Sequence, residues 1–269
     1  MKTLYIDCGM GAAGDMLTAA LLELLPEGAR TAFVEFFNML GIPGVRMSAE
    51  QSTKCGVVGT HVTVTVGGME EDETMHDHDH SHDHEQTHTH ADGTTHSHSH
   101  NGMYEIEHLV RYHLPLSSKV KDDIIAVYDI IAAAESKVHG VPVTEIHFHE
   151  VGTMDAVADV TAVCMLMDRI GPEQVIVSPI NTGSGHVRCA HGILPVPAPA
   201  TANILIGMPA YSNDIQSELL TPTGAALLKH FATGYGNMPV MTTQAVGYGM
   251  GKKDFPVANC VRVMLGESM

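Results

Sequence analysis

A polar segment at residues 67–102 sets the strongest limit on how this chain of 269 residues can fold. The apolar residues that recur before and after it give way there to Glu, Asp, His, Ser and Thr. Such a composition cannot bury enough apolar area to offset the entropy lost when a chain becomes ordered. We therefore predict one core domain, formed by residues 1–66 and 103–269, that is interrupted by a disordered insertion at 67–102.

The insertion is rich in histidine. Ten of the 25 residues between positions 76 and 100 are histidine, mostly separated by a single Asp, Ser or Thr. Neutral imidazole is a good ligand for Ni, Cu and Zn, and carboxylates add charge and further donors. We predict a metal reservoir, with a solvated polar linker as the alternative, and we expect the chemistry to need a rigid site elsewhere. The predicted ligands of the reservoir are His76, His78, His80, His82, His84, His88, His90, His96, His98 and His100.

Charge and cysteine content exclude several classes of protein. The formal net charge is −17 and no Lys or Arg lies between Lys54 and Arg111, so nucleic acid and anionic membranes would be repelled. No apolar run approaches the ~18 residues of a membrane span, and the first residues do not resemble a secretory leader. The 5 cysteines are scattered without a C-x-x-C pair, which favours reduced thiols in a cytoplasm.

Apolar periodicity alternates between strand and helix on both sides of the insertion. Helices are predicted at residues 15–25, 29–40, 105–113, 118–138, 155–170, 199–206 and 222–232. Strands are predicted at 4–8, at 174–178, at 257–265 and as a pair within 45–66 that turns near Gly56. Interleaved elements of this kind favour an α/β fold, with a mixed α+β fold as the alternative, in which helices flank a sheet.

The first candidate site follows the opening strand. Glycines at positions 9, 11 and 14 form a G-x-G-x-x-G spacing between Asp7 and Asp15, after a strand and before a helix. Glycine lets a phosphate approach the backbone, and free N–H groups at a helix start attract it. We predict a phosphate cradle at Gly11 and Gly14, and a tight structural turn is an equal alternative. Asp15 is also a candidate N-cap, and Asp7 a candidate ligand or base.

The second candidate site lies at residues 147–159. In an extended segment His147 and His149 share one face, and on a helix Asp155 and Asp159 share one face. Together with Glu150, these groups can converge on one metal ion or act as acid and base. The alternative is a surface strand that leads into a helix capped by Asp155.

Two further motifs occur near the end of the chain. Three prolines follow His191 and fix a rigid extended segment, so His191 is either a metal ligand or an ordinary surface histidine. Residues 218–226, ELLTPTGAA, place hydroxyls and free amides at a helix start with Pro at its first position. Thr221, Thr223 and Gly224 are therefore candidates for binding a substrate phosphate or carboxylate, and a well-capped helix is the alternative.

Taken in order, these motifs resemble the LarC family. The resemblance is carried by D-x-x-x-G-x-x-G-D-M, the His-rich insertion, HFHEVG-x-x-D-x-x-x-D, HG-x-LPVPAPAT and E-L-x-T-P-T-G-A-A, and it covers nearly the whole chain. It implies insertion of nickel into pyridinium-3,5-bisthiocarboxylic acid mononucleotide, which completes the nickel-pincer cofactor of lactate racemase. The implied enzyme is a nickel insertase, a cyclometallase of the nickel-chelatase type of lyase, which forms one nickel–carbon and two nickel–sulfur bonds.

The resemblance also implies cofactors, partners and residue roles. CTP with Mn²⁺ or Mg²⁺ belongs to a C-terminal domain of the family, and we expect this chain to be the N-terminal part, which would need that domain as a separate polypeptide. Further expected partners are the thiolated substrate, lactate racemase apoenzyme and a second copy of the chain. The implied catalytic residues are Asp7, Asp15, His149, Glu150 and Asp159, and the implied nickel ligands outside the insertion are His147, His149, Asp155 and His191.

Two other functions fit parts of the sequence. A nickel storage or chaperone protein would act through the insertion alone, with the core as a carrier. A metal-dependent hydrolase would use His147, His149 and the neighbouring carboxylates with Zn or Mn. Removal of the insertion separates storage from insertion, because an insertase should keep its turnover at saturating nickel.

Overall fold

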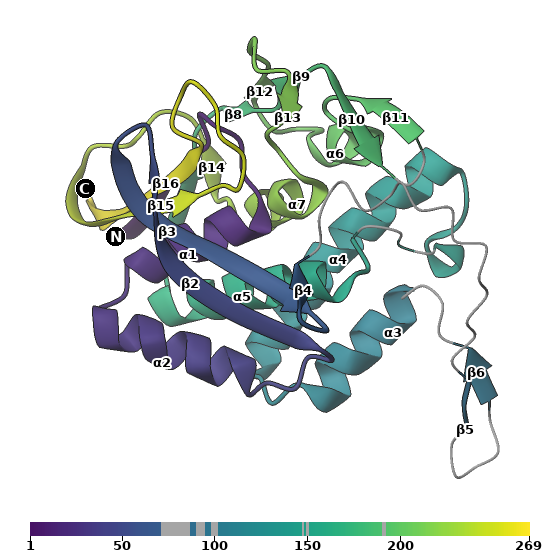
Figure 1. Cartoon of the computed structure of the whole chain (residues 1–269). Coiled ribbons are helices and arrows are strands. Elements are labelled where there is room, and N and C mark those ends of the chain that lie inside the picture. Colours follow the sequence, from purple (N-terminus) through teal and green to yellow (C-terminus); the bar gives the residue numbers. More distant parts are fainter. Residues whose placement is uncertain (71–86, 90–94, 98–101, 147, 149–150, 190–191) are drawn as a thin grey trace.

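The computed structural model describes residues 1–70, 87–89, 95–97, 102–146, 148, 151–189 and 192–269. Its centre is a mixed eight-stranded sheet (Figure 1). The strands are β1 (Lys2–Asp7), β2 (Val45–Lys54), β3 (Val57–Val66), β4 (Met69–Glu70), β7 (Gln174–Val177), β14 (Gly234–Tyr235), β15 (Met241–Met250) and β16 (Cys260–Ser268). They follow the order β14-β7-β1-β16-β15-β3-β2, with β4 beside β3. The predicted α/β class, with a sheet flanked by helices, is confirmed.

Helices form the rest of the core, and each predicted helix is present within a few residues of its expected ends. They are α1 (Gly14–Glu23), α2 (Glu27–Asn38), α3 (Met103–His108), α4 (Ser118–His139), α5 (Met154–Ile170), α6 (Pro199–Ile204) and α7 (Pro222–Phe231), with a π-helical turn at Leu109–His113 after α3 and a 3₁₀ turn at Val143–Glu145. α1, α2 and α5 contact strands of the sheet, and α4 packs against α5, α6 and α7 (Figure 1). Among the described helices, none is both long and apolar enough to cross a bilayer.

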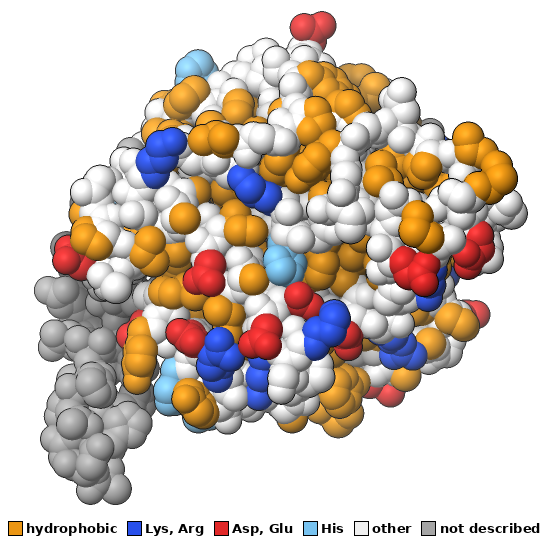
Figure 2. Space-filling view, turned by 180° about the vertical axis from the view of Figure 1, so that it is seen from behind, with side chains coloured by type: hydrophobic (Ala, Val, Ile, Leu, Met, Phe, Trp, Pro, Cys, Tyr) orange, Lys and Arg blue, Asp and Glu red, His pale blue; other side chains and the backbone are white. Residues whose placement is uncertain are grey.

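Short strands occur in the loops and in part of the insertion. The pairs are β8 (Ile180–Asn181) with β12 (Ala210–Tyr211), β9 (Gly183–Ser184) with β13 (Ser217–Glu218), β10 (His186–Cys189) with β11 (Gly192–Pro195), and β5 (Thr87–Thr89) with β6 (Thr95–Ser97). The predicted disorder is wrong for residues 67–70, because they form a turn and β4, which pairs with β3. Most of the insertion after them lies outside the described residues, so its disorder and its metal binding stay predictions. Seen from behind, the surface mixes acidic, basic and apolar side chains, so the acidic excess is not collected on this face (Figure 2).

The helix α1 lies directly on β15. The side chains of Leu17 and Leu21 on α1 are buried, and β15 presents glycines toward the helix. A Cβ atom at Gly247 or Gly249 would overlap with a carbonyl oxygen of α1, at Ala20 and Met16 respectively. Apolar periodicity did not predict β15, because the strand packs through glycine backbone instead of through alternating large side chains.

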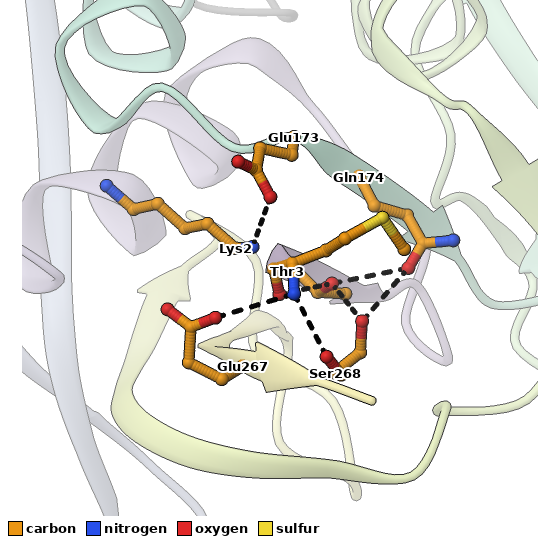
Figure 3. A network of polar contacts seen from close by, with 7 residues as sticks. Lys2, Thr3, Glu173, Gln174, Glu267 and Ser268 are labelled. Atoms are coloured by element: carbon orange, nitrogen blue, oxygen red, sulfur yellow. Dashed lines mark hydrogen bonds and ion pairs between the residues drawn. The ribbon is translucent and has the colours of Figure 1, made fainter.

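Three distant parts of the chain are joined at the start of β1. The amino group of Met1 donates to the carbonyl of Ser268 at 3.0 Å, and the backbone N–H of Lys2 donates to Glu173 Oε2 at 2.9 Å (Figure 3). Thr3 Oγ1 lies 2.8 Å from Ser268 Oγ and donates to Gln174 Oε1 at 3.2 Å. These contacts hold β1 between β16 and β7, which fixes the turn that follows β1.

The close approach of α1 and β15 predicts that Gly249→Ala is destabilising. The added Cβ atom would meet the Met16 carbonyl, and overpacking of this kind costs about 1–3 kcal/mol in free energy of unfolding. The control is Gly28→Ala on α2, where an added Cβ atom would meet no described atom outside the local helix backbone within 4 Å, and Ala is expected to add about 0.4–1 kcal/mol to the free energy of unfolding. Urea unfolding of both variants measures the difference, and equal midpoints would contradict this packing.

Candidate functional site

The Gly-rich turn after β1 packs against the start of α7. The N–H of Ala12 donates to the carbonyl of Leu219 at 2.9 Å, and the N–H of Thr221 donates to the carbonyl of Ala12 at 3.1 Å. Gly11 has a φ of +76°, and a Cβ atom there would overlap with the Leu219 carbonyl; one at Gly224 would overlap with the Ala12 carbonyl. The first and fourth motifs are therefore in contact, and glycine is needed at both positions because the two backbone segments lie too close together for a Cβ atom.

A buried asparagine joins the third motif to the same turn. Asn181 Nδ2 donates to the carbonyl of Gly9 at 3.0 Å, and its Oδ1 accepts from the N–H of Gly183 at 3.0 Å. Asn181 is 1% exposed, and its amide group links these two backbone segments. His186, further along the third motif, is exposed on β10.

The carboxyl group of Asp159 lies against the first residue of α1. A Cβ atom at Gly14 would lie 2.6 Å from both Cβ and Oδ2 of Asp159, so glycine leaves the room that the carboxyl occupies. The N-cap of α1 is Ala13, which offers no side-chain cap, and a carboxylate near a helix start is favoured by the helix dipole. Asp159 Oδ1 is buried and has no hydrogen-bond partner within the part of the chain that the structure describes.

Burial and charge raise the pKa of this carboxyl group. Burial raises the pKa of Asp159 well above its usual value, and the charges of Asp15 and Asp155 raise it further. Burial also raises the pKa of Asp15, although the N–H of Met16, which donates to Asp15 Oδ1 at 2.7 Å, and the nearby His61 act in the opposite direction. The carboxyl groups of Asp15 and Asp159 therefore lie near each other at the start of α1, where their mutual repulsion favours binding of a cation or uptake of a proton.

The described residues of the second motif are held beside this cluster. Tyr128 of α4 is fully buried, and its Oη donates to the carbonyl of Val151 at 3.2 Å. Its ring lies 6.0 Å from that of Phe148, which is also buried. The hydroxyl of Thr153, the N-cap residue of α5, donates to Asp155 Oδ1. Asp155 and Asp159 share one face of α5 as predicted, but the N-cap is Thr153, so a capping role for Asp155 is wrong.

The structure bears on two predictions for the first motif, the role of Asp7 as a ligand or base and the role of Asp15 as an N-cap. Asp7 faces Arg262 on the neighbouring strand β16: Arg262 Nη2 donates to Asp7 Oδ2 at 2.6 Å, and the N–H of Gly9 donates to Asp7 Oδ1 at 3.1 Å. Both carboxylate oxygens are therefore engaged, which weighs against Asp7 as a base. Asp15 is not the N-cap of α1, because that position is Ala13 and Asp15 lies in the first turn.

The start of α7 agrees with the prediction for the fourth motif. Thr221 is the N-cap, its Oγ1 accepts from the N–H of Gly224 at 3.1 Å, and Pro222 opens the helix. Thr223 Oγ1 lies 3.1 Å from Thr221 Oγ1, so two hydroxyls stand together at the helix start. The cap is confirmed, and anion binding there stays a prediction.

Several predicted ligands cannot be placed. In the described ranges, no three His, Cys, Asp or Glu side chains form a group that could hold a metal ion. His88 and His96 are partners in the short β5–β6 pair. The candidates that lie outside the described residues are His147, His149, Glu150, His191 and, in the insertion, His76, His78, His80, His82, His84, His90, His98 and His100.

Sequence reasoning missed His61, Asn181 and Arg262. His61 lies among the alternating Val and Thr residues of β3, where a polar residue is expected on a solvent face, and nothing local connects it to Asp15. Asn181 stands next to a glycine-containing motif, which is the one signal that could have found it. Arg262 depends on the antiparallel register of β16 with β1, and that register is not encoded in a local pattern.

A surface pocket of about 280 Å³ lies away from this cluster. It is lined by Phe33 of α2 and by Met165 and Arg169 near the end of α5. Asp155 lies near the start of α5, so about 15 Å of helix, at 1.5 Å per residue, separates it from Met165, the first residue of α5 in the pocket lining. The pocket is therefore not part of the site formed by the motifs.

The raised pKa of Asp159 predicts a pH-dependent gain in stability for Asp159→Asn. The pKa of Asp159 is higher in the folded chain than in the unfolded chain. The contribution of this carboxyl to stability is therefore fully present below its pKa in the unfolded chain, and it is lost as the pH rises through its pKa in the folded chain. Because Asn does not titrate, the metal-free variant should melt above wild type at neutral pH, with a gain that vanishes near ~pH 4, the ordinary Asp range. Circular dichroism melts across this range measure it.

The control for this measurement is Asp168→Asn. Asp168 lies on the same helix but is partly exposed and paired with Lys119 at 3.1 Å, so its replacement should not stabilise the protein. A destabilised Asp159→Asn at neutral pH would contradict the assignment of an unfavourable buried charge.

Comparison with known proteins assigns the chain to a family. A family described as "Nickel insertion protein" matches residues 4–269. The chain is 37% identical over 269 residues to the pyridinium-3,5-bisthiocarboxylic acid mononucleotide nickel insertion protein of Geobacillus kaustophilus, covering 99% of this chain and 60% of that protein. The chain is 35% identical over 263 residues to the protein of that name from Staphylococcus saprophyticus, covering 97% of this chain and 59% of that protein. It is 38% identical over 273 residues to a putative nickel insertion protein of Geotalea daltonii, covering 100% of this chain and 62% of that protein.

The chain thus spans about 60% of the length of the curated relatives that it matches. No solved structure matches it significantly. Since the family match runs over nearly the whole chain, including the turn, the carboxyl cluster and the start of α7, this chain belongs to the nickel insertion protein family.

Proposed function

We propose that this chain inserts nickel into pyridinium-3,5-bisthiocarboxylic acid mononucleotide, the activity for which its relatives are named. The observation that carries the proposal is the carboxyl of Asp159, which has a buried unpartnered oxygen among the described residues and lies where the first and second motifs meet. A buried carboxyl oxygen without a partner is costly for folding, and such costs are typical of functional sites.

The chemistry requires a proton acceptor. Insertion breaks the C–H bond of the pyridinium carbon between the two thiocarboxylates and forms a nickel–carbon bond, so one proton must pass to a base. A carboxyl with a raised pKa binds a proton more readily near neutral pH, and this supports Asp159 as the acceptor. The two sulfur atoms of the substrate then complete the bonds to nickel.

The phosphate of the substrate is assigned to the start of α7. The hydroxyls of Thr221 and Thr223 stand together there, and the helix dipole favours an anion. At Gly14 the corresponding place is taken by the Asp159 carboxyl, which makes the start of α1 the less suitable of the two predicted positions. Gly11 and Gly14 then serve close packing, the second of their two interpretations.

Nickel supply and nucleotide dependence complete the proposal. The histidines of residues 76–100 would collect nickel in the cytoplasm and raise its concentration near the site. CTP with Mn²⁺ or Mg²⁺ would act through a C-terminal domain of the family, supplied separately, and lactate racemase would receive the finished cofactor. These parts follow from the resemblance in the motifs.

An insertion assay tests the proposal. The chain is incubated with nickel and the bisthiocarboxylate mononucleotide, with and without CTP and a relative's C-terminal domain, and the product is read by mass and by activation of lactate racemase. We expect the nickel-bearing nucleotide, and a loss of about 10²–10⁴-fold in rate for Asp159→Asn, the usual effect of removing an acid–base group. Asp168→Asn is the matched control and should keep the wild-type rate.

No product under any condition, or an unchanged rate for Asp159→Asn, would refute this function. The histidine content of the insertion favours nickel storage as the second candidate. A chain that lacks residues 70–102 should keep its turnover at saturating nickel if it is an insertase, whereas a storage protein would lose most of its bound nickel. A hydrolase would instead cleave simple esters with Zn or Mn and need no thiolated nucleotide.

A further inference from the structure

One histidine that no motif includes lies beside the start of α1. Gly249 at the end of β15 is the register partner of Thr60 on β3, and it packs against the carbonyl of Met16 on α1. The first turn of α1, the end of β15 and the middle of β3 therefore meet at one point. His61 follows Thr60, and Asp15 precedes Met16, so the imidazole and the carboxyl belong to residues that flank the same contact.

The imidazole of His61 is oriented as in many metal sites. Its Nδ1 lies 2.9 Å from the carbonyl oxygen of Met250. A carbonyl oxygen can only accept, so Nδ1 carries a hydrogen, and in the neutral imidazole Nε2 then holds the lone pair. Metal-binding histidines are commonly fixed by such a bond from the other ring nitrogen to a backbone carbonyl. Among the described residues no partner for Nε2 is present, and the residue is partly exposed.

The carboxyl of Asp15 supplies a second donor nearby. Its Oδ1 accepts the N–H of Met16 at 2.7 Å, which fixes the carboxyl and leaves Oδ2 for a ligand. A positive charge on His61 lowers the pKa of Asp15 and a negative charge on Glu70 raises it, so all three groups share one electrostatic environment. Glu70 is itself paired with Lys252 at 3.0 Å, and the carboxyl of Asp159 lies against Gly14, the residue before Asp15.

We propose that His61 Nε2 and the Asp15 carboxylate form a rigid two-donor site that receives a divalent metal ion at the start of α1. The proposal rests on the proposed function for the identity of its metal, nickel, which imidazole and carboxylate donors suit. Two protein donors leave the remaining coordination positions for water and for the sulfur atoms of the substrate. The site differs from the histidine-rich insertion because its ligands are fixed by secondary structure and by the bond to Met250.

Nickel binding in a modified full-length chain tests the pair. The ten histidines between positions 76 and 100 are replaced by Asn, so that the insertion no longer dominates binding, and nickel chloride is titrated by calorimetry. We expect one weak site, with an affinity at least tenfold lower in His61→Ala, in His61→Asn and in Asp15→Asn. His139→Ala, which changes a partly exposed histidine beside Glu135 on α4, is the control and should bind as the parent chain does.

The Asn variant separates a ligand from a structural role. Its side-chain amide can still donate to the Met250 carbonyl, so His61→Asn should recover the thermal stability lost in His61→Ala but not the affinity for nickel. Parent-like affinity in His61→Asn, or no nickel binding by the parent chain, would overturn the site. Insertion is assayed on the same samples: an active parent with unchanged binding in His61→Asn refutes this site alone, whereas an inactive parent refutes the proposed function.

Discussion

The contact between the Asp159 carboxyl and the start of α1 is the interaction on which the site depends. Gly14 leaves room for the carboxyl, and the helix dipole favours its negative charge. Burial and the neighbouring charges of Asp15 and Asp155 act against it and raise its pKa. The two effects together keep a titratable carboxyl group in a place where folding alone would favour a neutral side chain.

The surrounding fold keeps that contact in place. α1 packs closely on β15 because β15 has glycine at the contact. α5, which carries Asp155 and Asp159, packs against α1, and the turn before α1 is hydrogen-bonded to the start of α7. The N-terminal ends of α1, α5 and α7 meet at this site, so the positive ends of their helix dipoles lie close to negatively charged side chains. Such an arrangement suits a reaction that brings together a metal cation, an anionic substrate and a transferred proton.

Much of the fold was predictable because its helices are amphipathic and its first strands alternate cleanly. Val62 and Val64 of β3 are buried as their period-2 spacing indicates, and Gly140 ends α4 in a left-handed conformation. β15 was not predictable, because its glycines become informative only when α1 is placed against them. The order of strands in the sheet, which sets Arg262 beside Asp7, is likewise a property of the assembled sheet.

The candidate site was predictable in part for the same reason. The shared helix face of Asp155 and Asp159 and the helix cap at Thr221 were predictable, because each depends only on residues close together in the sequence. The encounter of Asp159 with Gly14, and of His61 with the region of Asp15, joins segments far apart in the sequence. His147 and His149 lie outside the described residues, so their role as ligands stays a prediction.

Anomalous diffraction at the nickel absorption edge, from crystals of the chain grown with nickel and the bisthiocarboxylate mononucleotide, would locate the metal. We expect a nickel peak at the start of α1, within coordination distance of Asp15. Nickel found only among the histidines of residues 76–100, with substrate bound elsewhere, would contradict it.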